Sequence, residues 1–136
     1  MVDLAREGKG GASSSLTVIS ERQNLPLPYL EQLFLKLRRA DLVKSARGSN
    51  GGYMLVRSPA ETNIYDIIAA VDIPMKATRC KDHSLAGCQF NQARCLTHNL
   101  WEGLEKTVHS YLRTVSLEDV CHKKITTSFL LSEGQD

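Results

Sequence analysis

Residues 28–56 read PYLEQLFLKLRRADLVKSARGSNGGYMLV, and this stretch decides the fold that we predict. Its first half places apolar side chains at i, i+3, i+4 and i+7, which is the spacing of one face of a helix. These side chains are Leu30, Leu33, Phe34 and Leu37. The pattern predicts a helix over residues 28–40, with Pro28 at the first position, where its missing N–H is no loss.

The second half of the same stretch predicts a β-hairpin. Residues 42–46 and 53–56 are each expected to form a short strand, and the glycines and asparagine between them tolerate the positive φ of a tight turn. A brief helix over residues 17–23 is expected before the turn at residues 24–28, with Val18 and Ile19 facing inward. Helix, turn, helix and hairpin in this order predict a winged helix-turn-helix, a mainly α fold with a small β-hairpin wing.

Three further segments complete the chain. Residues 1–7 are expected to end a helix at Gly8, and Thr62 or Asn63 can cap a helix that reaches Val71 and stops at Pro74. Residues 75–96 show no periodicity. A long helix is expected from Thr97, with one broad apolar side formed by Leu100, Trp101, Leu104, Val108, Tyr111, Leu112 and Val115. Ser116 can cap a further short turn.

Composition bounds the class of protein. The chain has 136 residues, of which 42% are hydrophobic and 24% charged, as in an ordinary globular domain. No stretch reaches the roughly 18 apolar residues of a membrane-spanning helix, and residues 1–6 do not resemble a secretory signal. We therefore expect a cytoplasmic protein without a membrane partner, whose clustered thiols stay reduced and favour metal binding over disulfides.

Positive charge is concentrated in one segment. The net charge is only +2, but residues 36–57 carry six basic side chains and one acid. These are Lys36, Arg38, Arg39, Lys44, Arg47 and Arg57, with Asp41 as the acid. A local basic stripe on a nearly neutral protein is typical of phosphate binding. The alternative is a solvated helix face followed by a charged hairpin.

The predicted DNA-contacting residues lie on the second helix and the hairpin. They are Pro28, Tyr29, Glu31, Gln32, Lys36, Arg39, Arg47 and Gly48. Gln32 can pair with adenine, and Glu31 can accept a hydrogen bond from the cytosine amino group. Lys36, Arg38 and Arg39 would contact the phosphate backbone, and Arg47 at the hairpin tip would enter the minor groove. Glu31 and Gln32 could instead be ordinary surface residues of an amphipathic helix.

The unpatterned segment contains a possible metal site. Cys80, Cys88, Cys95 and His98 offer three thiolates and an imidazole, which make a complete four-ligand set. Cys95 and His98 would share one helix face if the long helix already begins at Cys95. Core cysteines are a poor alternative in so polar a segment, and we expect Cys121 to be a spare thiol.

The spacing alone leaves the kind of centre open. A structural zinc accepts the same donors, although zinc sites usually show Cys-x-x-Cys pairs and this chain has none. His83 is a further candidate ligand. A thiol enzyme that uses Cys95 and His98 would need an orienting carboxylate and oxyanion donors, and the sequence shows neither.

Several runs resemble the IscR type of iron–sulfur cluster-dependent transcriptional regulators. They are ATRC (77–80), CLTHNLW (95–101), YLEQLF (29–34), and RG (47–48) with GGY (51–53). The likeness extends from about residue 2 to residue 121. The cluster-loop runs are specific to this type of regulator, whereas the winged-helix runs are shared with a broader family.

The resemblance implies a homodimer that binds a [2Fe–2S] cluster through Cys80, Cys88, Cys95 and His98. It implies transcriptional control of iron–sulfur assembly genes on double-stranded DNA, with the assembly machinery as cluster donor and no enzymatic activity. It also implies that the freedom of Glu31 depends on cluster state, and that the long helix pairs with its copy. A structural zinc-binding winged-helix adaptor or regulator, and a helix folded back on its own head, remain the alternatives.

Two departures from that family affect the expectations. The loop between the cysteines is longer than usual, which should change the exposure of a cluster more than its ligation. Family members also begin earlier, so Met1 is expected to fall within their first helix, a change that would weaken DNA affinity and stability. The expected parts are a winged helix-turn-helix domain at residues 1–74 (helix-turn-helix about 16–40, wing 42–56), a cluster loop at 75–98, a dimerisation helix at 97–120 and a flexible tail at 121–136.

Overall fold

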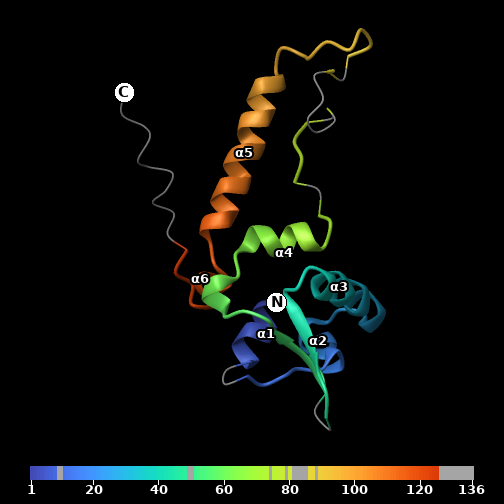
Figure 1. Cartoon of the computed structure of the whole chain (residues 1–136), viewed down its shortest axis with the longest axis vertical. Helices are drawn as coiled ribbons and strands as arrows, with labels where there is room; N and C mark the ends of the chain where they lie inside the picture. The colour runs from blue at the N-terminus through green and yellow to red at the C-terminus, as the bar shows by residue number, and fades with distance from the viewer. Residues whose placement is uncertain are drawn as a thin grey trace.

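A computed structural model describes residues 1–8, 11–48, 51–73, 75–78, 80, 86–87 and 89–125 (Figure 1). Its elements are α1 (Val2–Glu7), α2 (Leu16–Gln23), α3 (Leu27–Arg39), β1 (Val43–Ala46), β2 (Gly52–Leu55), the 3₁₀ helix η1 (Pro59–Glu61), α4 (Ile64–Ala70), α5 (His98–Thr114) and α6 (Leu117–Cys121). The mainly helical fold with a two-stranded wing is therefore confirmed, and its bounds agree closely with the predicted ones.

The core forms around the apolar face of α3. Leu30, Phe34 and Leu37 are almost completely buried, whereas Leu33 is only partly covered. The other buried members of this cluster are Leu4, Ile19, Leu42 and Val43, one or two from each neighbouring element. Each such side chain contributes about 1.5–3 kcal/mol on leaving water. The packing of these side chains fixes α3 against the rest of the head.

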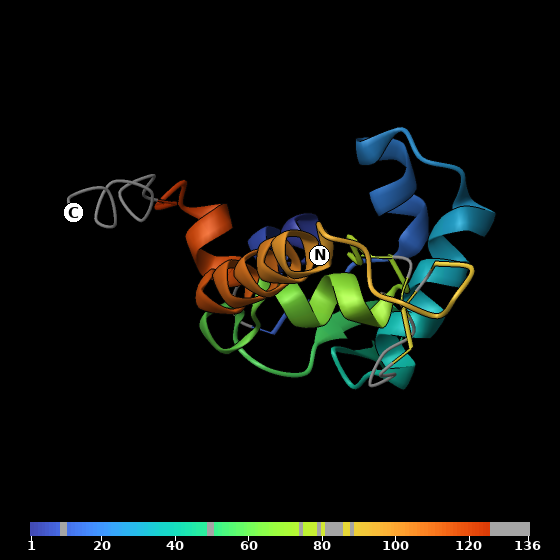
Figure 2. The ribbon, with the colours of Figure 1, turned by 90° about the horizontal axis from the view of Figure 1, so that it is seen from above.

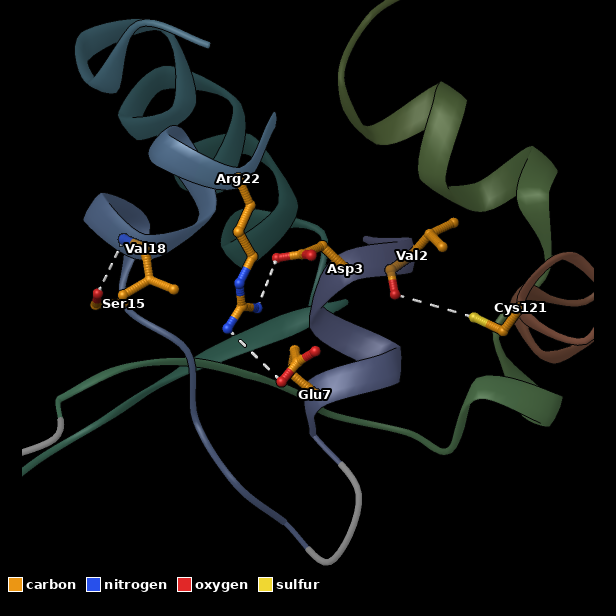
Figure 3. A network of polar contacts seen from close by, with 7 residues as sticks. All are labelled: Val2, Asp3, Glu7, Ser15, Val18, Arg22 and Cys121. Carbon is orange, nitrogen blue, oxygen red and sulfur yellow. Dashed lines mark hydrogen bonds and ion pairs between the residues drawn. The ribbon is translucent and has the colours of Figure 1, made fainter. Parts of the chain in front are cut away.

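Helix α2 buries only one of the two side chains that were expected to face inward. Ile19 is buried, but Val18 is 38% exposed, so the expectation that both face inward is wrong. Successive residues of a helix point about 100° apart, and a helix that touches the core along a narrow line buries only one of such a pair. The amide of Val18 instead donates to the Ser15 side chain, which caps the helix (Figure 3).

An ion-pair network attaches α2 to α1. Arg22 lies 3.4 Å from the carboxylate of Asp3 and 3.6 Å from that of Glu7 (Figure 3). Asp3 is largely covered while Arg22 and Glu7 are substantially exposed, so we assign the pair with Asp3 the larger part of a modest contribution.

The wing is broadened by the chain that precedes α2. Strands β1 and β2 pair antiparallel, with Val43 opposite Leu55. Ser14 forms an additional bridge to Tyr53, through backbone hydrogen bonds of 3.0 and 2.9 Å. A Cβ atom at Gly52 would collide with the backbone of Ser14. Glycine at this position therefore permits the close approach that joins the connector to the wing.

Helix α5 projects from the head, on the side opposite the hairpin (Figure 1). It stands beside α4 (Figure 2), where the Tyr65 ring meets the edge of His109 and the guanidinium of Arg113 lies 3.9 Å from the ring centroid. Cation–π and edge-to-face contacts of this kind each contribute about 0.5–1 kcal/mol. Within the described residues, we find no helix with the length and apolar character that crossing a bilayer requires.

The chain bends sharply after α5. Residues 97–120 contain two helices rather than one continuous helix, because Val115 adopts an extended conformation and Ser116 caps α6. The Ser116 side chain accepts from the amide of Asp119, and the Asp119 carboxylate accepts from Ser116 in return. Leu117 is fully buried. The cap predicted at Ser116 is confirmed, and the structure shows that it is a capping box with Asp119.

Replacing Gly52 with alanine should destabilise the protein by about 1–3 kcal/mol, since the new methyl group forces the Ser14 bridge apart. Gly103→Ala is the matched control: its Cβ meets nothing within 4 Å, and alanine in a helix interior should stabilise by about 0.5–1 kcal/mol. Urea unfolding of both variants tests this. Equal stability of the two would contradict the role given to Gly52.

Acid should weaken the α6 cap. Hydrogen bonds from the Ser116 side chain and backbone hold the pKa of the Asp119 carboxyl below its ordinary value of 3.8. Because the folded state lowers this pKa, the stabilisation is complete above 3.8 and disappears as the pH falls through the lowered value. In urea unfolding, wild type should exceed Asp119→Asn at about pH 7, and the gap should close in acid. A gap that is independent of pH would refute this account.

Candidate nucleic-acid interface and metal centre

The polar side chains at the start of α3 are exposed as a group. Pro28, Glu31 and Gln32 are exposed to solvent, and Tyr29 is 52% exposed although it belongs to an apolar residue class. They lie at the N-terminal end of the second helix of the helix-turn-helix, which is the end that meets base edges in this motif. The structure thus leaves the predicted reading residues available to a duplex.

Basic side chains flank this surface on two elements. Arg38 and Arg39 are exposed at the other end of α3, and Arg47 is exposed just beyond β1. Gly48 follows with φ of +132°, a conformation that few other residues adopt, and its carbonyl accepts from Gly51 at 3.0 Å. Arg47 therefore lies between the end of β1 and the positive-φ residue Gly48.

Lys36 differs from the other predicted phosphate contacts. Its ammonium group lies 3.0 Å from the Asp72 carboxylate and 3.5 Å from the Val71 carbonyl oxygen, at the C-terminal end of α4. A cation is favourable at a helix C-terminus. The structure therefore gives Lys36 a partner within the head, and its contact with DNA stays a prediction.

The metal loop brings two of the four predicted ligands together. The Cys80 sulfur lies 3.3 Å from Nδ1 of His98, the first residue of α5. Cys80 is 7% exposed and His98 is 6% exposed, although both lie in a segment of polar sequence. The pair is buried between the loop and the beginning of α5, where little water competes for either atom.

The remaining candidates occupy different positions. Cys95 lies one turn before α5, with its sulfur 3.5 Å from the Thr97 hydroxyl. Because the helix begins at His98, the idea that Cys95 and His98 share a helix face is wrong; a backbone bond from His98 to Cys95 closes a turn instead. Cys88 and His83 lie outside the described residues. Among the described residues, no three metal-ligating side chains converge.

Cys121 lies far from this pair. It belongs to α6, with its sulfur 4.0 Å from the Val2 carbonyl oxygen (Figure 3). The 17 residues of α5 separate it from His98, a helix length of roughly 25 Å. The structure thus supports its assignment as a separate thiol.

The buried pair fits an iron–sulfur or zinc centre chemically. A thiolate and an imidazole nitrogen are both ligands of such centres. Two ligands on one tetrahedral metal, with bonds of about 2.3 Å to sulfur and 2.0 Å to nitrogen, lie about 3.5 Å apart. The observed sulfur–nitrogen distance of 3.3 Å is close to that separation. Cys80 and His98 could therefore serve as neighbouring ligands with little movement.

One contact to the loop was not predicted from the sequence. Glu105, in the middle of α5, accepts a hydrogen bond of 3.1 Å from the backbone amide of Ala77. The bond joins residues 28 positions apart and uses a main-chain donor. Nothing in the side-chain pattern around Ala77 could have indicated it.

The apolar side of α5 is open to solvent. Leu100 is 64% exposed, and Trp101, Leu104 and Val108 are also exposed. These four side chains do not pack on the head of their own chain, which the monomeric alternative would require. They form a continuous apolar face, because residues three and four apart lie next to each other on a helix.

Comparison with known proteins places these features in a family. The Rrf2 family, described as "Iron-dependent Transcriptional regulator", matches residues 1–123. The HTH-type transcriptional regulator IscR of Aliivibrio salmonicida is 46% identical over 120 residues, which cover 88% of this chain and 69% of that protein.

Solved structures show the same architecture. T. potens IscR matches with a TM-score of 0.69 and 34% identity, over 99% of this chain and 84% of that one. CymR, the global cysteine regulator of B. subtilis, matches with a TM-score of 0.71 and 31% identity, over 90% of this chain and 87% of that one. The scaffold is therefore shared by regulators with different names.

Proposed function

Because the chain belongs to the Rrf2 family of DNA-binding transcriptional regulators, and is not an enzyme, we propose that it is an IscR-type member that senses iron–sulfur cluster status. The observation that carries this proposal is the buried pair of Cys80 and His98, 3.3 Å apart at the start of α5. Identity to IscR proteins over most of the chain supports the same conclusion.

The proposed cofactor is a [2Fe–2S] cluster held by Cys80, Cys88, Cys95 and His98. When bound, the cluster supplies a redox-active centre that joins the loop to the start of α5. Cys80 and His98 would contribute a preformed half of the site, and Cys95, one turn before His98, would contribute a further thiol. Imidazole is a neutral ligand that titrates near neutral pH, so a site with one histidine releases its cluster more readily than one with four thiolates.

The proposed DNA surface is the exposed start of α3 together with the wing. Pro28, Tyr29, Glu31 and Gln32 would meet base edges, while Arg39 and Arg47 with Gly48 would hold the phosphate backbone and minor groove. A carboxylate near phosphates is repelled unless it finds a donor. Glu31 would therefore exclude duplexes that lack a suitably placed cytosine amino group.

A homodimer through α5 would complete the molecule. The exposed face of Leu100, Trp101, Leu104 and Val108 is the kind of surface that a second helix covers. Two-fold symmetry would place two α3 helices on half-sites one or more helical turns apart. The genes controlled would be those of iron–sulfur assembly, with the assembly machinery as cluster donor and the cytoplasm as the site of action.

Structural zinc is the competing use of the same donors, and metal analysis separates the two. Protein purified without oxygen should contain iron and acid-labile sulfide and absorb visible light. Cys80→Ala should lose both components, because it removes half of the buried pair. The matched control Cys121→Ala should keep them, since that thiol lies at the far end of α5. Zinc without sulfide in the wild type, or full loading of Cys80→Ala, would overturn the assignment.

DNA binding should separate the roles of Arg47 and Glu31. Arg47→Ala should weaken binding to all duplexes and lower the slope of log affinity against log salt by about 1. Glu31→Ala should relax the sequence preference at one base pair by about 1–3 kcal/mol. Fluorescence anisotropy on a random duplex, and selection from a randomised pool, measure the two effects. Lys106→Ala on α5 is the charge control; an equal loss in that variant would contradict the assigned surface.

A further inference from the structure

Helix α5 presents a polar face toward the loop, beside its exposed apolar face. His98 and Glu105 are seven residues apart, which is nearly two helical turns, so they lie on the same side. Both contact the segment that ends at Cys80, the first predicted cysteine ligand. His98 lies next to the Cys80 sulfur, and Glu105 accepts a hydrogen bond from the amide of Ala77. The segment is thus attached to α5 at two points.

The chain from Ala77 to Cys80 can span about the same distance as the helix from His98 to Glu105. Seven residues of helix rise about 10.5 Å. The three residues from Ala77 to Cys80 can span at most about 10–11 Å when extended. A chain anchored at Glu105 can therefore bring its cysteine to His98, and its short length limits how far from Glu105 the thiol can lie.

From this geometry we infer that Glu105 is a positioning residue for Cys80. Its carboxylate fixes the Ala77 amide and so holds the Cys80 thiol against His98 before any metal or cluster is present. The inference deepens the proposed function, since it rests on Cys80 and His98 being ligands. Anchoring the loop in advance reduces the conformational entropy that ligand binding would otherwise have to overcome.

The neighbouring carboxylate on α5 shows that this role is specific to one position. Glu102 lies on the adjacent part of the same face, but its carboxylate is 3.3 Å from the Lys106 ammonium on its own helix. Glu105 is the carboxylate that reaches across to the loop backbone. Glu102→Ala is therefore a control that is matched in residue type, helix and solvent exposure.

The test is the reactivity of Cys80 in cluster-free, reduced protein. Iodoacetamide labelling followed by peptide mass spectrometry gives the rate at each cysteine, with Cys121 as the internal reference. Glu105→Ala should label Cys80 about fivefold faster than wild type, because losing one solvent-exposed hydrogen bond of typical strength shifts the opening equilibrium by about that factor. Glu102→Ala should leave the rate unchanged. Glu105→Gln keeps an acceptor oxygen at this position and should stay close to wild type.

Three outcomes would overturn the inference. They are an unchanged Cys80 rate in Glu105→Ala, an equal rise at Cys80 and Cys121, which indicates general loosening, and an equal rise in Glu102→Ala. Circular dichroism melting of each variant establishes that it is folded. Iron and sulfide analysis of wild type tests the proposed function separately: a chain that takes up neither would refute the cluster, while labelling would still decide whether Glu105 positions Cys80.

Discussion

The position of α5 depends on two backbone hydrogen bonds at its C-terminal end. The Ile64 amide donates to the Val115 carbonyl at 3.0 Å, and the Leu117 amide donates to the Thr62 carbonyl at 2.8 Å. The fully buried side chain of Leu117 closes the joint, and α6 returns to pack against α1. Helix α5 is anchored at its C-terminal end and projects from the head. Its N-terminal half is therefore positioned by the residues that contact it. In the structure these contacts come from the loop, through Cys80 and Ala77. The apolar face of this half is exposed.

The same scaffold serves regulators with different names. CymR and IscR structures both match the chain with similar TM-scores. The head, the wing and the projecting helix are common to them, so the fold alone does not select a cofactor. Under the proposed function, the selection comes from the side chains that the loop presents to the start of α5. In this chain they include a thiol and an imidazole that are both buried and close enough to share one metal.

The features that were predicted from the sequence are those that depend on residues close together in the chain. The face of α3 follows from the spacing of Leu30, Phe34 and Leu37, and the start of α6 from a cap at Ser116 answered three residues later by Asp119. The missed features are long-range and use main-chain atoms or single charges. No periodic pattern in the sequence indicates these contacts. They are the Ser14 bridge to the wing, the pairing of Lys36 with Asp72 and the hydrogen bond from Ala77 to Glu105. The prediction that Val18 faces inward was wrong for a related reason. The apolar character of a side chain does not show how much of a short helix contacts the core. Cys80 and His98 were predicted as ligands, but only the folded chain shows that they meet.

The same long-range contacts form a continuous physical route from the loop to the recognition helix. Cys80 is attached to α5 through His98, and the segment before it through Glu105. That segment leaves the end of α4, where the Val71 carbonyl and the Asp72 carboxylate hold Lys36 of α3. One route by which a ligand at the loop would alter α3 therefore runs through the end of α4. Coupling of this kind is reciprocal, because one free energy links both binding events. A loop state that favours duplex binding must itself be favoured by the duplex, so DNA would change how firmly the loop retains its ligand.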